Sequence, residues 1–279
     1  MTAVALSPIR RILLALDIGN ESTASLEASL ALAARLDAEL AALFVEDEEL
    51  LRLAALPFAH ELGSMSAARR PLRDQDLERT LRRRAARSEA ALAAAATRAN
   101  VRWSFRVARG LIASRVIEAA MEADLVTFFL GGDPLQLSRR RALVQRTLAV
   151  SARPVLLLPA GAELRPPCLV VFDGSDAAHR ALRLAARLAG AGQGALRILL
   201  PVAPADSARL RAAAEAVLAD MAVPGEFRIL PALTTADLAR AARREAAGTV
   251  LLPATGDLLS PERAGRLLGD VGCATLLVP

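Results

Sequence analysis

The chain has 279 residues, which is enough for two domains that each bury a core of their own. Apolar residues make up 54% of it, but arginine or an acidic residue interrupts every long apolar stretch, so the sequence predicts no membrane-spanning helix. The formal net charge is only +5, with arginine as the sole strong base because lysine is absent, and this small excess does not by itself indicate nucleic-acid binding.

The first residues also bear on location. An apolar stretch precedes the basic pair Arg10 and Arg11, which is the opposite of the order in a secretory signal. The two cysteines, Cys168 and Cys273, both fall in apolar runs that we interpret as buried strands, where a free thiol behaves as a small apolar side chain. We therefore expect a cytoplasmic protein without a disulfide.

The first half of the chain alternates short apolar runs with longer segments of helical periodicity. We expect strands at 11–16, 40–45, 101–107, 125–130 and 154–158. Strands separated by helices are typical of parallel sheets with crossover connections. The strands are continuously apolar rather than alternating, so we expect helices on both faces of the sheet.

Residues 46–72 have no counterpart of similar length in the second half, and they include His60. We expect a helical flap over one end of the sheet, and a mobile lid over a site is the alternative.

The next segment, "LERTLRRRAARSEAAL", predicts a helix with one basic face and one apolar face. Its apolar face would pack on the sheet and its basic face would be solvated. A basic helical face can bind phosphate backbones, but the chain has seven Phe, one Trp and no Tyr, so few aromatic rings are available to stack on bases. The basic face comprises Arg79, Arg83 and Arg87, and the apolar face Leu77, Leu81, Ala85, Ser88 and Leu92.

The chain repeats itself. The stretch "ILLALDIGNESTASLEASLALAARL" resembles "CLVVFDGSDAAHRALRLAARL", which runs from Cys168 to Leu188, and the second copy is shorter by four residues. In addition, "FRVARGLIASRVIEAA" aligns without a gap with "FRILPALTTADLARAA". The strand ends "PVLLLP" and "ATLLVP" close the two copies. The repeat predicts two domains, residues 1–160 and 167–279.

The second copy repeats the pattern of strands and helices. We expect its strands near 167–172, 195–200, 226–230, 249–252 and 274–278. Apolar positions three and four residues apart predict one buried stripe on the first helix of each copy: Leu26, Leu30 and Ala33, then Ala178, Leu182, Ala185 and Ala189.

Together these pieces are similar to the universal stress protein family. The resemblance rests on "VVFDGSDAAHRALRLAARLA" from Val170, "VARG" ending at Gly110 and "ADLVTFFLG" from Ala123, and it covers nearly the whole chain as two tandem copies. It implies an α/β fold of the adenine-nucleotide-binding type. We expect two doubly wound five-stranded parallel sheets of strand order 3-2-1-4-5, paired through their last strands as an intramolecular pseudo-dimer.

Ligands of such sheets bind outside the carboxyl ends of the strands, where the strand order reverses. The resemblance implies that an aspartate after the first strand and a valine at the end of the second lie near the base and ribose of ATP. A loop of pattern Gly-x2-Gly-x9-Gly-Ser/Thr would hold the phosphates, because glycine lets backbone N–H groups approach phosphate oxygens. The expected nucleotide-binding residues are Asp17, Gly19, Val45, Gly110, Gly131, Gly132 and Arg141 in the first half, and Asp173, Gly174, Ser175, Val202, Gly256, Gly265 and Arg266 in the second.

Both copies depart from that loop. In the first, Pro134 stands at the second glycine and the run 139–141, all arginine, replaces the final Gly-Ser pair. In the second, Pro253 replaces the first glycine, and Gly265 comes one residue early, before Arg266. Arginine can pair with phosphate directly, whereas the acidic residues Asp133 and Asp257 would repel it.

The stretch "DIGNEST" also resembles the Ser-Gly-Gly-x-Asp-Ser-Thr loop of the ATP pyrophosphatases. It departs at Asp17, a negative charge where phosphate would rest, and at Ile18, which adds bulk. We interpret it as a strand-to-helix turn with Asn20 or Ser22 as the helix cap. The matching positions are Gly19, Ser22 and Thr23, with Glu21 in the acid position.

The sequence thus predicts a tandem universal stress protein with a regulatory or protective role under stress. We expect it to bind ATP or another adenine nucleotide without turning it over, and we identify no catalytic residue. His60 and His179 are isolated from other metal-binding residues, so we expect no metal site. The alternatives are a nucleotide-independent protein-interaction module of the same fold and an ATP pyrophosphatase-like enzyme. A protein partner and a homodimer beyond the paired halves are compatible with this interpretation, whereas membrane and nucleic acid are not expected partners.

Overall fold

The structure is a computed structural model. It describes residues 9–16, 23–56, 60–62, 69–71, 74–130, 134–159, 161–190, 196–231, 233–254 and 271–279. Of these, the first half contributes β1 (Arg11–Leu16), α1 (Thr23–Leu36), β2 (Glu39–Asp47), α2 (Glu48–Ala54), β3 (His60–Leu62), β4 (Arg69–Pro71), α3 (Asp74–Ala99), β5 (Trp103–Gly110), α4 (Ile112–Met121), β6 (Leu125–Leu130), α5 (Pro134–Ser151) and β7 (Val155–Pro159).

The second half follows after a linker that begins at Gly161. Its described elements follow the same alternation of strands and helices, with a short 3-10 helix before α7 and with no described counterpart of α2, the hairpin or α5. They are β8 (Cys168–Val171), α6 (Asp176–Ala189), β9 (Leu196–Leu200), η1 (Pro204–Asp206), α7 (Ser207–Met221), β10 (Glu226–Ile229), α8 (Thr235–Arg244), β11 (Thr249–Pro253) and β12 (Ala274–Val278).

Ten of the described strands form one sheet in the order β10-β9-β8-β11-β12-β7-β6-β1-β2-β5. Within each half the order is 3-2-1-4-5, as predicted. The expected pairing through the last strands is confirmed: the fifth strands β7 and β12 pair antiparallel, with Leu156 opposite Leu276, and join the two five-stranded sheets into one continuous sheet. Pairing satisfies the backbone groups that each fifth strand would otherwise leave exposed at an edge.

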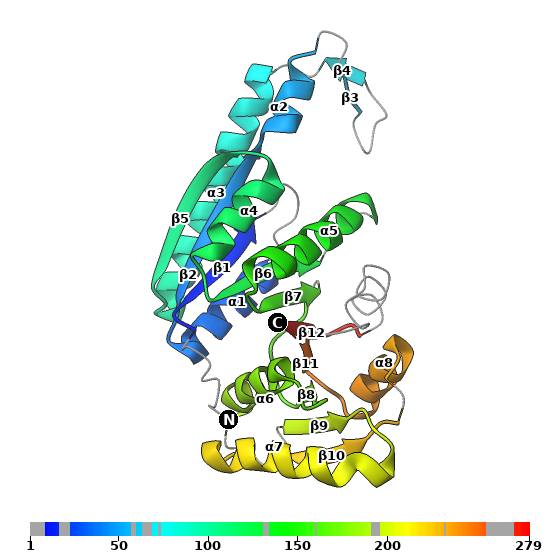
Figure 1. The fold of residues 1–279 in the computed structure, drawn as a ribbon. Coiled ribbons are helices and arrows are strands. Elements are labelled where there is room, and N and C mark those ends of the chain that lie inside the picture. The colour runs from blue at the N-terminus through cyan, green and yellow to red at the C-terminus, as the bar shows by residue number, and fades with distance from the viewer. Residues whose placement is uncertain are drawn as a thin grey trace.

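Helices cover both faces of this sheet (Figure 1). Core side chains of α1, α3, α6 and α7 form one apolar cluster, and those of α4, α5 and α8 form the other. Both clusters contain residues from both halves, such as Leu156 and Leu276 in one and Leu157 and Leu277 in the other. The hydrophobic layers therefore run across the junction between the halves.

The predicted helix faces are found where expected. All seven stripe positions of α1 and α6 are buried. On α3, Leu81, Ala85 and Leu92 are buried, whereas Arg83 and Arg87 are exposed. Cys168 is buried in β8 as predicted, but Cys273 precedes β12 and is only partly buried, so its placement inside a strand is corrected.

The 46–72 insertion contains the helix α2, together with a two-stranded antiparallel hairpin of β3 and β4 that the sequence did not predict. Strands of three residues are too short to show an apolar alternation. In Figure 1, α2, the hairpin and one end of α3 project beyond the rest of the first half. No helix in the described ranges is long and apolar enough to cross a membrane.

Candidate functional site

The strand order reverses between β1 and β6 in the first half and between β8 and β11 in the second. The carboxyl ends of these strands are the candidate ligand sites of a doubly wound sheet. Seven of the predicted residues lie in the described ranges: Val45, Gly110, Arg141, Asp173, Gly174, Ser175 and Val202. The other seven lie outside them: Asp17, Gly19, Gly131, Gly132, Gly256, Gly265 and Arg266.

In the second half a tight turn joins β8 to α6. The backbone N–H of Ser175 donates to Oδ1 of Asp173 at 2.9 Å, and the Ser175 hydroxyl oxygen accepts from the N–H of Ala178 at 3.1 Å. Ser175 is thereby the N-cap of α6. Gly174 between them has φ of +82°, a conformation that glycine adopts without strain. The exposed Asp173 carboxylate is thus held beside the amino end of a helix.

His179 of α6 stabilises this turn. Its Nδ1 donates to the carbonyl oxygen of Ser175 at 2.9 Å, and its ring meets the buried ring of Phe172 edge-on, with centroids 4.9 Å apart. On the other side, a Cβ added at Gly174 would lie 2.8 Å from Cδ2 of Leu210 on α7, so α7 lies directly against the turn. Val202, which follows β9, is partly exposed.

In the first half, charged side chains form ion pairs at the end of β2. Val45 is only 3% exposed, and Glu46, the next residue of β2, is 8% exposed. Arg109 of β5 donates through Nε to Glu46 Oε2 at 3.0 Å and through a terminal nitrogen to Glu78 Oε1 of α3 at 3.0 Å. The hydrogen bond and charge of Glu46 raise the pKa of Arg109. This ion-pair cluster ties β2, β5 and α3 together at the end of β2.

Two other predicted positions have local structural roles. Gly110 has φ of +151°, and a Cβ there would lie 2.6 Å from Nε of Arg115, which donates to the carbonyl oxygen of Arg109 at 3.0 Å. In the arginine run of α5, Arg140 is 7% exposed and donates to the carbonyl oxygen of Phe129 near the end of β6 at 3.1 Å. Nε of Arg141 is buried with no hydrogen-bond partner in the described part of the chain.

Sequence reasoning missed Glu46, Arg109 and His179 as parts of these sites. Their roles depend on pairs that are distant in the chain or on ring contacts, which no spacing rule reports. The acidic run that begins at Glu46 was a usable signal, because a charge that directly follows a buried strand needs a partner.

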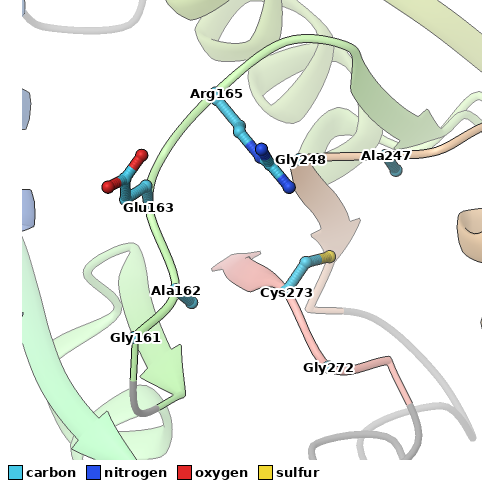
Figure 2. A pocket seen from close by; sticks show the side chains of 8 residues that line it. All are labelled: Gly161, Ala162, Glu163, Arg165, Ala247, Gly248, Gly272 and Cys273. Carbon is cyan, nitrogen blue, oxygen red and sulfur yellow. The ribbon is translucent and has the colours of Figure 1, made fainter.

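A separate cavity of about 310 Å³ lies at the opposite, amino edge of the second half (Figure 2). Its walls come from the linker and from the residues before β11 and β12, and none was predicted as a site residue. Burial raises the pKa of the Cys273 thiol in its wall to about 11, so the thiol is a weak nucleophile near neutral pH. Among the described residues no group of three or more His, Cys, Asp or Glu side chains could hold a metal ion.

Comparisons with known proteins agree with this architecture. Solved structures that match almost the whole chain include a universal stress protein from Archaeoglobus fulgidus, with 16% identity, a TM-score of 0.71 and coverage of 96% of this chain and 95% of that one. A functionally unknown protein from Pseudomonas aeruginosa PAO1 matches with 17% identity, a TM-score of 0.54 and coverage of 97% and 92%. At these identities the likeness concerns the fold.

A search of curated protein sequences finds no match. The profile of the universal stress protein family, however, matches residues 165–257, which include the Asp173–Ser175 turn. The chain therefore carries a universal stress protein family domain at residues 165–257, within an α/β fold that repeats the same strand order in both halves.

Proposed function

We propose that the protein is a stress-response protein with a regulatory or protective role in the cytoplasm, and that it binds ATP or another adenine nucleotide at the carboxyl end of β8. One observation carries the proposal: the exposed Asp173 carboxylate stands beside the capped amino end of α6, within the residues that match the family.

The chemistry of this place suits a nucleotide. A carboxylate accepts hydrogen bonds from ribose hydroxyls or from the adenine amino group. The amino end of a 14-residue helix favours negative charge, so phosphates have a favourable place close to the same turn. His179 and Leu210 contact the turn and hold it in place, which lowers the loss of conformational entropy when a ligand binds.

The asymmetry between the halves supports binding in the second. Leu40 pairs with Ile12 as Leu196 pairs with Cys168, so Val202 stands where the first half has Glu46. Val202 is partly exposed, whereas Glu46 is 8% exposed and is held by Arg109. Arg109 is exposed, but Glu46 is buried, so a nucleotide that displaced Arg109 would leave a buried carboxylate without its partner, which is costly.

The first experiment is to denature protein purified without added ligand and to quantify released adenine nucleotide per chain, followed by calorimetric titration with ATP. We expect Asp173→Asn to weaken ATP binding at least about tenfold, the loss expected when a charged hydrogen-bond partner is removed. Asp17→Asn tests the first half, and Asp220→Asn on the exposed face of α7 is the matched control. Absence of ATP binding, or a loss confined to Asp17→Asn, would overturn the proposal.

We further propose binding without turnover. Incubation with ATP should release neither phosphate nor pyrophosphate above the level of a boiled sample. A release rate that scales with protein concentration and falls in Asp173→Asn would contradict this.

A nucleotide-independent interaction module is the second candidate. The insertion favours it, because Leu53 and Leu56 are 54% and 40% exposed beside α3, whose Arg83, Arg84 and Arg87 form no ion pair in the described ranges. If these leucines are covered in a homodimer, sedimentation should show a concentration-dependent dimer in the wild type that Leu53→Ser with Leu56→Ser abolishes. A monomer at all concentrations would count against that arrangement.

A further inference from the structure

The linker between the halves forms one wall of the amino-edge cavity. It places the guanidinium group of Arg165 in that wall. The cavity, of about 310 Å³, is lined by the linker residues Gly161, Ala162, Glu163 and Arg165 and by the residues just before β11 and β12. Figure 2 shows the Arg165 side chain extending toward Gly248 and Cys273, while the Glu163 carboxylate points away from them.

The position of Arg165 is built into the fold. Its backbone N–H donates to the hydroxyl oxygen of Thr249 at 3.2 Å, and that hydroxyl donates to the Arg165 carbonyl oxygen at 3.1 Å. Thr249 is 1% exposed, so the threonine end of both bonds is buried. A Cβ at Gly248 would lie 2.3 Å from both Cγ and the carbonyl oxygen of Arg165. Any larger residue at position 248 would therefore clash with the backbone and side chain of Arg165.

The first half has different residues at the positions equivalent to Gly248 and Cys273. Leu125 pairs with Ile12 as Thr249 pairs with Cys168, so Gly248 stands where the first half has Asp124. By the same pairing of the next strands, Cys273 stands where the first half has Arg153.

Asp124 fills that place with a carboxylate. Its Oδ2 accepts from the N–H groups of Arg10 at 2.8 Å and Arg11 at 3.1 Å, and its Oδ1 lies 4.0 Å from a terminal nitrogen of Arg153. In the second half Gly248 supplies no carboxylate. Pro166 and Pro167 stand at the positions of Arg10 and Arg11 and have no N–H to satisfy.

The second half nevertheless has a cation beside the cavity. Arg165 is exposed and forms no ion pair with any carboxylate in the described part of the chain, and its side chain lines the cavity. A guanidinium presents N–H donors in a fixed fork that matches the oxygens of a phosphate or carboxylate. We propose that the amino-edge cavity binds a small molecule through its phosphate or carboxylate group, which pairs with Arg165. This site is independent of the proposed nucleotide site at the carboxyl edge.

Cys273 offers a readout that does not depend on knowing the ligand. Burial raises its pKa, and the positive charge of Arg165 opposes that rise. An anion paired with Arg165 would cancel the opposing charge and lower the thiolate fraction further. A rise of one pKa unit slows alkylation about tenfold.

The experiment measures the iodoacetamide alkylation rate of Cys273 by peptide mass mapping while inorganic phosphate, or in a second arm acetate, replaces chloride at constant ionic strength. We expect saturable protection of Cys273 in the wild type and in Arg187→Gln, an exposed arginine of α6 as control, and no protection in Arg165→Gln. The buried Cys168, mapped in the same samples, reports any general unfolding. The phosphate and acetate arms distinguish the two ligand chemistries.

Absence of saturable protection in the wild type would overturn the proposal without reference to any variant. Equal protection in Arg165→Gln would also overturn it, because the effect would then be an adventitious ion effect. Arg165→Lys keeps the charge and loses the fork, so we expect it to retain only part of the protection.

Discussion

At the scale of single residues, Gly248 allows the linker to pack closely against the start of β11 because it has no side chain. Its lack of a Cβ lets the linker pass within contact distance at Arg165, and the buried Thr249 hydroxyl then fixes the linker backbone. The counterpart in the first half is Asp124, whose side chain binds the backbone of the preceding strand instead. Equivalent positions thus hold the strand starts by different means.

Replacement of Gly248 by alanine should therefore destabilise the folded protein. The added Cβ would lie 2.3 Å from a backbone oxygen, which cannot rotate away, so we expect a loss of about 3 kcal/mol in the free energy of unfolding. Gly272→Ala is the control: nothing lies within 4 Å of its Cβ, and its φ of +67° should cost about 1 kcal/mol. Urea denaturation measures both, and equal losses would refute the steric explanation.

Asp237 predicts a specific dependence on pH. The Thr234 hydroxyl, and then Arg240, hold the pKa of this carboxyl below its ordinary value of 3.8. A group whose pKa is lowered by folding stabilises the folded state above its unfolded pKa, and this contribution is lost as the pH falls through the folded value. The stability difference between wild type and Asp237→Asn should therefore be constant near neutrality and shrink below about pH 4.

The measurement is the melting temperature of both proteins between about pH 2 and pH 7. Asp220→Asn on α7, a carboxylate with no ion pair in the described ranges, should follow the wild type at every pH. A difference that persists unchanged to the lowest pH would show that Asp237 acts through its shape rather than its charge.

At the scale of elements, the helices begin in different ways. The sequence predicted α6 from its apolar stripe, whereas the cap bond from the N–H of Ala178 to the Ser175 hydroxyl was not predicted. For α1 the expected caps Asn20 and Ser22 lie outside the described residues. At α8, Thr234 and Asp237 form a reciprocal capping box that the sequence analysis did not use.

Ser175→Ala tests the first of these caps. Loss of the hydroxyl leaves the N–H of Ala178 without its acceptor, so we expect about 1 kcal/mol of destabilisation. Ser114→Ala on the exposed face of α4 is the control and should change stability by less than about 0.5 kcal/mol. If ATP binds at this turn, its affinity should fall in Ser175→Ala alone, and equal melting temperatures for the two variants would refute the cap's contribution.

At the scale of the whole molecule, three features join the halves. The β7–β12 pair joins the sheets, the two apolar clusters cross the junction, and Arg35 of α1 bonds to the second half. The guanidinium of Arg35 donates to the carbonyl oxygen of Leu188 at the end of α6, and to that of Leu164 in the linker at 3.3 Å. Cations are favourable at the carboxyl ends of helices. Arg187, the repeat counterpart of Arg35, is exposed, as Arg35 is.

We expect the halves to unfold together. Trp103, the single tryptophan, reports on the first half by fluorescence, and alkylation of the buried Cys168 reports on the second. In urea the two transitions should coincide in the wild type and in Arg187→Gln. In Arg35→Gln the midpoints should separate, with a loss of about 1–2 kcal/mol for the weaker half. Separate transitions already in the wild type would show that the halves are independent.

The sequence predicted the ten main strands to within a few residues, because buried parallel strands are continuous apolar runs and because the internal repeat allowed one half to check the other. The order 3-2-1-4-5 of each half was implied by the resemblance to the universal stress protein family. It placed the candidate site only in part. Asp173, Gly174 and Ser175 form one turn, but Gly110 has a local role and Val45 is buried in the apolar core. Half of the predicted site residues lie outside the described ranges, and their roles stay predictions.

What the sequence by itself determined is local: periodicity, turn residues and caps act over a few neighbours, so they specify strands, helices and the α/β class. Tertiary structure alone decided how distant segments meet. It paired Glu46 with Arg109 at the end of β2, and it placed Arg165 against Gly248, where the first half has Asp124 and where no carboxylate in the described ranges pairs with the guanidinium. The physical reason is that ion pairs, steric contacts and cavities depend on distances between groups far apart in the chain, which no repeat or spacing encodes.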